Sequence, residues 1–340
     1  MIVKSIVIVF FVMSAQMAVA SWHSFSFDVM GTRAAVDFWL ADAARAKEIA
    51  SEVEAEMRRI ESVMSPYIDT SELSVVNSGG NAKHAMSISQ ELYSVIETAQ
   101  RVSVISEGVF DVSFASVGFL YDYRNRLRPA AEQLERALQA VDYRSIDIST
   151  EKKGSNNRER YFIRFLRDDM RIDLGGIAKG YAVDQLAELL VSYNIENFLV
   201  EIGGEMRLSG NKANNESWKI AIEKPESLQR SVQKIISIGN NAIATSGDYR
   251  NYYAQDGVRY SHLINPTTGY PITHNLVSVT VVHPSSMTAD GLATALNVIG
   301  KDKALAIADK YNFAVLLITK EKQQFKEYTS DKFEQLVTVH

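Results

Sequence analysis

Residues 171–181 read Arg-Ile-Asp-Leu-Gly-Gly-Ile-Ala-Lys-Gly-Tyr. The apolar residues before the glycine pair predict a short strand over residues 171–174. A set of apolar residues then repeats at helical spacing. It consists of Ile177, Val183, Leu186, Leu189 and Leu190. We therefore expect a strand, a tight turn at Gly175 and Gly176, and a helix start. Such a turn favours a bound phosphate, although glycines that only cap the turn are the alternative.

Residues 289–294 read Ala-Asp-Gly-Leu-Ala-Thr. A helix returns to the same face after about four residues, so the Asp290 carboxylate and the Thr294 hydroxyl are expected to lie together. Two hard oxygens on one helical face can hold a magnesium ion. A purely structural role is the alternative, because an Asp near a helix start suits the helix dipole and a Thr can bond a carbonyl one turn back.

Residues 260–271 read Tyr-Ser-His-Leu-Ile-Asn-Pro-Thr-Thr-Gly-Tyr-Pro. They predict a short strand that ends in a turn rich in Pro and Gly. His262 stands just before that turn, and its ordinary pKa near neutrality suits proton transfer. A structural histidine is the alternative.

These stretches belong to a series of blocks that run in one order from about Asp28 to about Thr329. The other blocks are residues 29–32 (Val-Met-Gly-Thr), 108–113 (Gly-Val-Phe-Asp-Val-Ser), 200–204 (Val-Glu-Ile-Gly-Gly), 244–250 (Ala-Thr-Ser-Gly-Asp-Tyr-Arg) and 278–281 (Ser-Val-Thr-Val). With these blocks the chain resembles the FAD:protein FMN transferases, the ApbE-like flavin transferases.

The resemblance implies transfer of the FMN part of FAD to a threonine hydroxyl of another protein, with Mg²⁺ required and AMP leaving. The acceptor would be an exported or membrane flavoprotein, such as a subunit of a respiratory electron-transfer complex. The implied fold is α+β, with largely antiparallel sheets, packed helices and the FAD site in a central cleft.

The resemblance also assigns site residues. Those expected to contact FAD are Met30, Tyr67, Val109, Phe110, Asp111, Asp173, Lys179 and Ile264. Those expected to hold magnesium are Asp290, Thr294 and the backbone carbonyl of Gly176. Because a threonine hydroxyl is a poor nucleophile at neutral pH, a base is needed, and His262 is the candidate. Asp248 could orient or replace it.

Three positions depart from the family pattern. Residues 117–123 read Val-Gly-Phe-Leu-Tyr-Asp-Tyr, where relatives have Gly-Pro-Leu followed by an element like Trp-Gly-Phe. Asn265 stands where Asp is usual, and Ala293 stands where some members carry a further acidic metal ligand. None of the three removes a residue that we expect to be essential.

Residues 1–20 predict a secretory signal, because Lys4 precedes an apolar run and the segment ends in Ala-Val-Ala. We therefore expect residues 21–340 to form an exported, periplasmic flavin transferase domain. An uncleaved membrane anchor is the alternative, although the apolar run is short for a span. The chain has no Cys, which excludes disulfides, thiolate sites and a lipid-modified cysteine. The net charge of -5 does not show the excess of basic residues that is typical of nucleic-acid-binding proteins.

The remaining patterns predict alternating groups of helices and strands. The expected helices are residues 41–64, 89–106, 129–141, 288–299 and 301–311. The expected strands, besides 171–174, are residues 145–149, 161–166, 198–202, 218–223, 234–238, 259–264, 276–282, 313–319 and 324–328. This order has no repeating βα unit, which favours an α+β fold with antiparallel sheet. One large domain or two interleaved ones would fit, and a homodimer stays open.

Other functions compete with flavin transfer. An FAD pyrophosphatase would use the same site with water in place of threonine, and an exported flavin-binding protein would bind without turnover. The metal pair Asp290 and Thr294 argues against a passive binder. A serine hydrolase using Ser246 or residues 231–234 lacks the companion motifs of that class.

Overall fold

The computed structural model describes residues 20–79, 84–122, 125, 127–153, 158–212, 215–225, 231–247, 252–255, 258–322 and 324–340. The signal expected over residues 1–20 lies outside this part, apart from residue 20. Within the described ranges, no helix is both long enough and apolar enough to cross a membrane.

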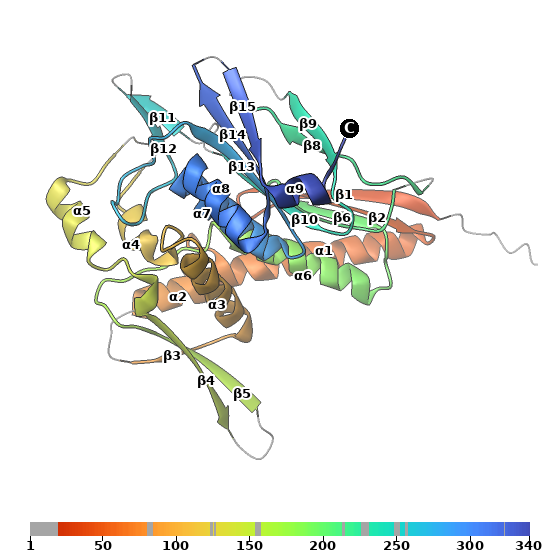
Figure 1. The fold of residues 1–340 in the computed structure, drawn as a ribbon. Helices are drawn as coiled ribbons and strands as arrows, with labels where there is room; N and C mark the ends of the chain where they lie inside the picture. Colours follow the sequence, from red (N-terminus) through yellow and green to blue (C-terminus); the bar gives the residue numbers. More distant parts are fainter. Residues whose placement is uncertain are drawn as a thin grey trace, which may run out of the picture.

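A large sheet runs through the molecule, with strand order β1-β2-β6-β7-β10-β13-β14-β15 (Figure 1). Its strands are β1 (Ser21–Val29), β2 (Thr32–Leu40), β6 (Phe198–Ile202), β7 (Glu205–Ser209), β10 (Ala242–Gly247), β13 (Leu276–His283), β14 (Ala314–Glu321) and β15 (Gln324–Thr329). All of its pairings are antiparallel. The predicted α+β class is confirmed.

Helices cover one face of this sheet (Figure 1). The helices on this face are α1 (Ala43–Met64), α2 (Glu72–Gly79), α3 (Gln90–Ile105), α6 (Ala178–Ser192), α7 (Ser286–Ile299) and α8 (Lys301–Tyr311). Two shorter helices, α4 (Ala115–Gly118) and α5 (Ala131–Leu138), pack in a separate small cluster, and α9 (Asp331–Leu336) lies on the opposite face. Inward-facing strand residues such as Val36, Ile202 and Val281 join apolar residues of α1, α3, α6 and α7 in the main core. Strand periodicity of two explains this, because alternate side chains point to the same face.

Smaller sheets surround the large one. β8 (Ile220–Glu223), β9 (Val232–Ser237) and β16 (Thr338–Val339) form a sheet that packs with α9 on the second face. β3 (Met86–Ile88), β4 (Ile146–Lys153) and β5 (Arg158–Phe165) form another, from which β4 and β5 project (Figure 1). β11 (Tyr252–Gln255) pairs with β12 (Val258–Ser261).

Helices α6 and α7 meet near their first turns, where their backbones touch. A Cβ added at Gly180 of α6 would lie 2.3 Å from the carbonyl oxygen of Ser286 in α7. Asp184 of α6 accepts the N–H groups of Ser286 and Met287 at 2.9 and 3.0 Å. In return, Asp290 of α7 accepts the N–H of Gly180 at 3.0 Å. Each helix therefore supplies a carboxylate to the free N–H groups and positive dipole end of the other.

The predicted strand over residues 171–174 is wrong. The apolar side chains of Ile172 and Leu174 are buried, as a strand pattern suggests. Their segment joins no sheet, because the Asn77 side chain satisfies the N–H and the C=O of Ile172, both at 2.8 Å. The Asp173 N–H donates to the Val112 carbonyl instead. A side chain thus supplies hydrogen bonds that a neighbouring strand would otherwise provide.

Several elements have no counterpart among the sequence predictions. The other predicted helices and strands exist, with exact ends for residues 198–202 and 301–311 and shifted ends elsewhere. The elements that were not predicted are β1, β2, α2, β3, α4, β7, β10, β11, α9 and β16. β1 and β2 carry an alternating burial pattern, so strand periodicity was a usable signal there.

We expect Asp184→Ala to lower the free energy of unfolding by about 3 to 5 kcal/mol, because Asp184 is buried, accepts the two α7 N–H groups and pairs with Arg207 at 2.8 Å. Asp42→Ala is the matched control. Asp42 also accepts two N–H groups at a helix start, but it is exposed, so its removal should cost about 1 kcal/mol. Urea unfolding of both variants measures the difference. Equal losses would show that the α6–α7 contact does not depend on Asp184.

Candidate active-site cleft

The main cavity opens where β7 and β10 separate. These strands pair only at Ala242 with Arg207 and at Ile243 with Met206, whereas β10 pairs with β13 along its whole length. Beyond Ile243, the strand lines a cavity of about 980 Å³. This volume lies at the upper end of the range for ligand pockets, so the opening is large enough for an extended ligand.

Most predicted site residues line this cavity, although they come from distant parts of the chain. Those that line it are Tyr67, Val109, Phe110, Asp111, Asp173, Gly176, Lys179, His262, Ile264, Asp290 and Thr294. Met30 is not among the lining residues, and its N–H donates to the Glu61 carboxylate at 2.9 Å. Asp248 lies outside the described residues.

The predicted glycine turn packs directly against α7. The Gly175 N–H donates to Asp173 Oδ1 at 2.6 Å, and burial raises the pKa of that carboxyl. A Cβ added at Gly176 would lie 3.2 Å from Thr294 Oγ1 and 3.3 Å from the Phe110 ring. Only a residue without a side chain fits comfortably here, and this brings the Gly176 backbone close to the Thr294 hydroxyl.

A carboxylate of the chain already interacts with the helix start that follows the turn. The Gly180 N–H, in the first turn of α6, donates to Asp290 Oδ2. The anion-binding property of a helix start is therefore present, but a carboxylate of the chain uses this N–H.

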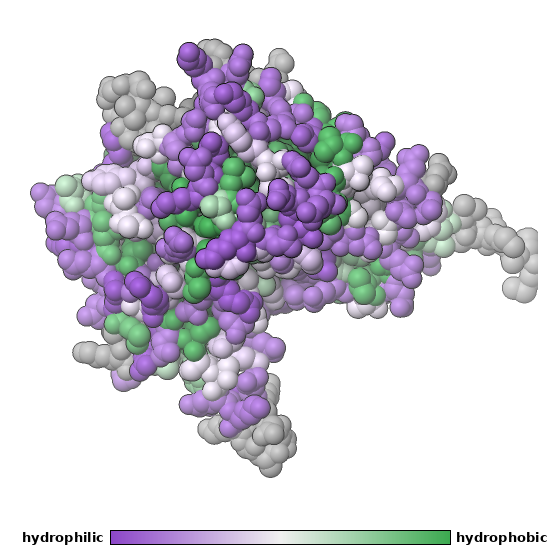
Figure 2. All heavy atoms as spheres, viewed as in Figure 1, coloured by the Kyte–Doolittle hydropathy of each residue, from purple (hydrophilic) through white to green (hydrophobic). Residues whose placement is uncertain are grey.

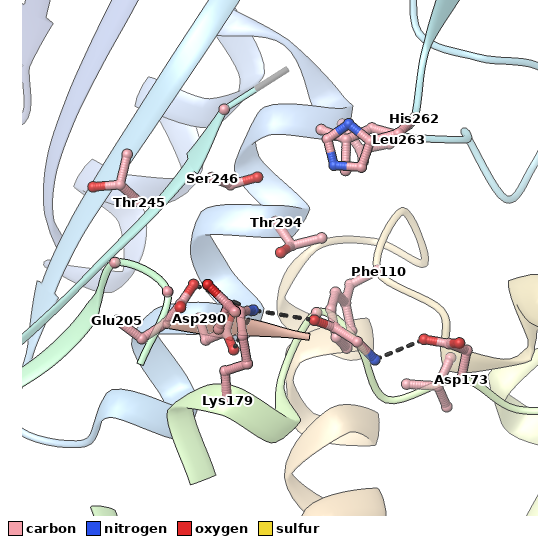
Figure 3. Close-up of a pocket in the computed structure, with 18 of the residues that line it drawn as sticks. Phe110, Asp173, Lys179, Glu205, Thr245, Ser246, His262, Leu263, Asp290 and Thr294 are labelled. Carbon is pink, nitrogen blue, oxygen red and sulfur yellow. Dashed lines mark hydrogen bonds and ion pairs between the residues drawn. The ribbon is translucent and has the colours of Figure 1, made fainter. Parts of the chain in front are cut away.

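A cluster of three charged groups lies beside the turn (Figure 3). The Lys179 Nζ lies 3.3 Å from Glu205 Oε1 and 3.7 Å from Asp290 Oδ2. It also donates to the Gly175 carbonyl at 3.3 Å. The cluster was only partly predicted, because Glu205 had been given no role. The available signal was an acidic residue directly after Gly203 and Gly204, ahead of the alternating apolar residues Met206 and Leu208.

The carboxylates of this cluster are deeply buried. Asp290 is 3% exposed and Glu205 is 4% exposed. Burial raises the pKa of Asp290, and it raises the pKa of Glu205 to about 8 although Lys179 opposes the shift. Burial also disfavours the charged form of Lys179, but the two carboxylates outweigh it and raise the pKa of the ammonium. Buried charges require such partners, since an unpaired one is strongly unfavourable.

The Asp111 carboxylate accepts hydrogen bonds from neighbouring groups of the chain. One oxygen accepts the N–H and the hydroxyl of Ser113, and the other accepts the Tyr143 N–H at 2.8 Å. Asp111 therefore shapes the loop that presents Val109 and Phe110 to the cavity.

His262 lies across the cavity, on the far side of Thr294 from the charged cluster (Figure 3). It stands on the loop that follows β12, and Ile264 forms a bridge with Pro271 in the same loop. Asn265 accepts the Thr267 N–H through its side-chain oxygen at 2.9 Å. An Asp oxygen could make the same turn, which explains why Asn is tolerated here.

Apolar and aromatic side chains border the cavity. Phe119, which lines it, is 43% exposed, and Tyr67 is 89% exposed. Figure 2 shows hydrophobic side chains gathered over the region of α4 and α5, where Leu120 and Leu127 are also exposed. Residues 117–122, the described part of the segment that departs from the family pattern, contact the His262 loop, because the Tyr121 hydroxyl donates to the Gly269 carbonyl at 2.8 Å.

The oxygen atoms beside the turn suit magnesium only together with a ligand. Among the described residues, no group of three or more His, Cys, Asp or Glu side chains could hold a metal ion alone. Asp290, Thr294 and the Gly176 carbonyl offer hard oxygens from one carboxylate, one hydroxyl and one backbone group. Mg²⁺ is commonly bound by one or two carboxylates with substrate phosphates and water, so this set fits the ion.

Comparisons with known proteins agree on one family. The ApbE family model matches residues 30–317. An FAD:protein FMN transferase of Vibrio cholerae is 42% identical over 296 residues, which cover 85% of each chain. Its Haemophilus influenzae counterpart is 40% identical over 290 residues, covering 84% of this chain and 82% of that protein.

Solved structures match over nearly the whole chain. The flavin transferase ApbE from Vibrio cholerae has a TM-score of 0.82 at 38% identity, covering 93% of this chain and 99% of that one. The apo flavinyl transferase ApbE of Pseudomonas stutzeri has a TM-score of 0.81 at 29% identity, covering 93% and 97%.

Proposed function

The chain belongs to the ApbE family, and from that premise we propose that it is an FAD:protein FMN transferase that moves FMN from FAD to a threonine of another protein. One structural observation carries the proposal furthest. The glycine turn, Lys179, Asp290 and Thr294 converge at one wall of the large cavity, and His262 stands across from them. This arrangement offers positive charge and hard oxygens to a pyrophosphate, with a base opposite.

The proposed reaction exchanges one bond to phosphorus for another. The threonine oxygen forms a bond to the riboflavin-side phosphorus, and the bond between that phosphorus and the bridging oxygen breaks. AMP leaves with the electron pair, and the hydroxyl proton passes to His262. Such a transfer depends mainly on positioning and on stabilising charge at the phosphates.

The residues of the chain have distinct proposed tasks. Lys179 supplies positive charge to the phosphates, while Asp290, Thr294 and the Gly176 carbonyl would hold Mg²⁺. When bound, that ion would offset charge on the phosphates and orient them. Phe110 and Val109 provide an apolar wall, which excludes water from the reacting atoms and favours transfer over hydrolysis.

We further propose that the enzyme acts outside the cytoplasm on an exported or membrane flavoprotein of a respiratory electron-transfer complex. The support for the location is the signal-like sequence of residues 1–20. The support for a protein acceptor is the name of the relatives, together with a cavity bordered by exposed side chains that a polypeptide can contact.

Asp290→Ala should abolish transfer by protein that is still folded, because it removes the only proposed charged ligand of the metal. It should also lower the stability, because the Gly180 N–H and Lys179 lose a partner. Thr294→Ala should have a smaller effect. In-gel flavin fluorescence of an acceptor domain measures transfer, and circular dichroism checks folding. Asp309→Ala, an exposed carboxylate variant on α8, serves as control. Wild-type transfer by the Asp290 variant, or full activity in excess EDTA, would disprove the magnesium role.

His262→Ala should lower the transfer rate by about 10² to 10⁴ with FAD affinity nearly unchanged, which is the usual contribution of a positioned base. Single-turnover kinetics measures the rate, and calorimetry measures the affinity. His84→Ala is the control, since His84 is exposed. Loss of FAD binding together with a lower melting temperature would instead identify His262 as a structural residue.

FAD should react and FMN should not, because FMN lacks the pyrophosphate and the AMP leaving group. We expect AMP to appear in step with flavin bound to the acceptor threonine, as followed by chromatography and mass spectrometry. An acceptor whose target threonine is replaced by alanine is the control. If AMP and free FMN form equally fast with and without acceptor, the enzyme is an FAD pyrophosphatase.

A further inference from the structure

The Lys179 ammonium occupies a position that suits a cation. Its neighbours are the Gly175 carbonyl oxygen, Glu205 Oε1 and Asp290 Oδ2, at 3.3, 3.3 and 3.7 Å. These are hard oxygens of the kind that also bind Mg²⁺. One of them belongs to Asp290, the carboxylate that we assign to the metal. The lysine and the metal therefore share a ligand.

A divalent cation on Asp290 would repel the nearby ammonium, because like charges a few ångströms apart in a buried site interact strongly. In the described part of the chain, the other carboxylate within 4.0 Å of the Lys179 Nζ belongs to Glu205. Its second oxygen, Oε2, is buried and has no hydrogen-bond partner among the described residues. An unsatisfied buried acceptor is costly, so this atom is an available partner for the ammonium.

The strand register explains why Glu205 reaches the lysine. Glu205 is the first residue of β7 and pairs with Ile202, whose side chain lies in the main core beside α6 and α7. Glu201 also lines the cavity but pairs with Met206, one position out of phase. Because successive side chains of a strand point to opposite faces, Glu201 lies on the other face of the sheet.

We propose that Glu205 is a positioning residue that retains the Lys179 ammonium when the metal takes Asp290. Without Glu205, the lysine pairs with Asp290 and competes with the metal for it. With Glu205, the lysine stays beside the turn, where it faces the phosphates of FAD. This inference rests on the proposed magnesium-dependent function. Glu205 then affects metal binding indirectly, through the position of the Lys179 ammonium.

The test uses Mg²⁺ alone, titrated calorimetrically into the folded, flavin-free protein. Four proteins are compared: wild type, Glu205→Gln, Lys179→Met and the double variant. Gln and Met keep nearly the shape of the side chains that they replace, so the charges are the main change. The shift of melting temperature caused by Mg²⁺ is a second readout that does not depend on activity.

Glu91→Gln is the matched control. Glu91 is also a partly buried carboxylate with a cationic partner, since it binds Arg59 at 2.7 Å and accepts the Tyr181 hydroxyl. It does not line the cavity. Its substitution should lower the melting temperature but leave the Mg²⁺ dissociation constant unchanged.

We expect Glu205→Gln to raise the Mg²⁺ dissociation constant at least about tenfold, because the lysine is left with Asp290 as its only carboxylate partner in the cluster. Lys179→Met should lower the constant, since it removes the competing cation. In the Lys179→Met background, Glu205→Gln should change the constant by less than about threefold, as expected for an effect that requires the lysine.

Two results would overturn the inference while leaving the magnesium role intact. The first is an unchanged dissociation constant in Glu205→Gln. The second is equal weakening by Glu205→Gln with and without Lys179, which would mean that Glu205 acts on the metal directly. If wild-type protein shows neither Mg²⁺ binding nor a melting shift, the proposed magnesium-dependent function itself fails.

Discussion

The exchange of carboxylates between α6 and α7 is the interaction on which the cleft depends. Asp184 of α6 binds the first N–H groups of α7, and Asp290 of α7 binds the Gly180 N–H of α6. Gly180 allows this, because any side chain there would collide with the Ser286 backbone. The two helix starts are held together as one unit, and the glycine turn before α6 is thereby placed against Thr294.

The two helix starts face the cavity, which forms where the large sheet divides. β7 leaves β10 after two paired positions, so the sheet divides and its unpaired edge lines the cavity. The division also brings Glu205 into the interior next to Lys179 and Asp290. The Lys179 ammonium stays charged there because it lies between two carboxyl groups, while burial raises the pKa of Glu205 to about 8.

The departures from the family pattern are accommodated by local structure. In the described residues 117–122, the Tyr121 hydroxyl contacts the His262 loop, and Asn265 makes a turn that Asp could also make. Ala293 is buried in the main core. The part of the cavity wall formed by Lys179, Asp290 and Thr294 is not affected by these changes, which is consistent with a shared chemistry in the family.

The sequence by itself determined the features that depend on local periodicity. The common helical face of Asp290 and Thr294 and the turn at Gly175 and Gly176 follow from spacing and from backbone freedom, which the chain encodes within a few residues. Only the tertiary structure decided the rest. Residues 171–174 lack a strand partner because Asn77, distant in sequence, satisfies their backbone. Glu205 became a site residue because strand register buried it beside a lysine of another element, and such long-range pairing leaves no local pattern.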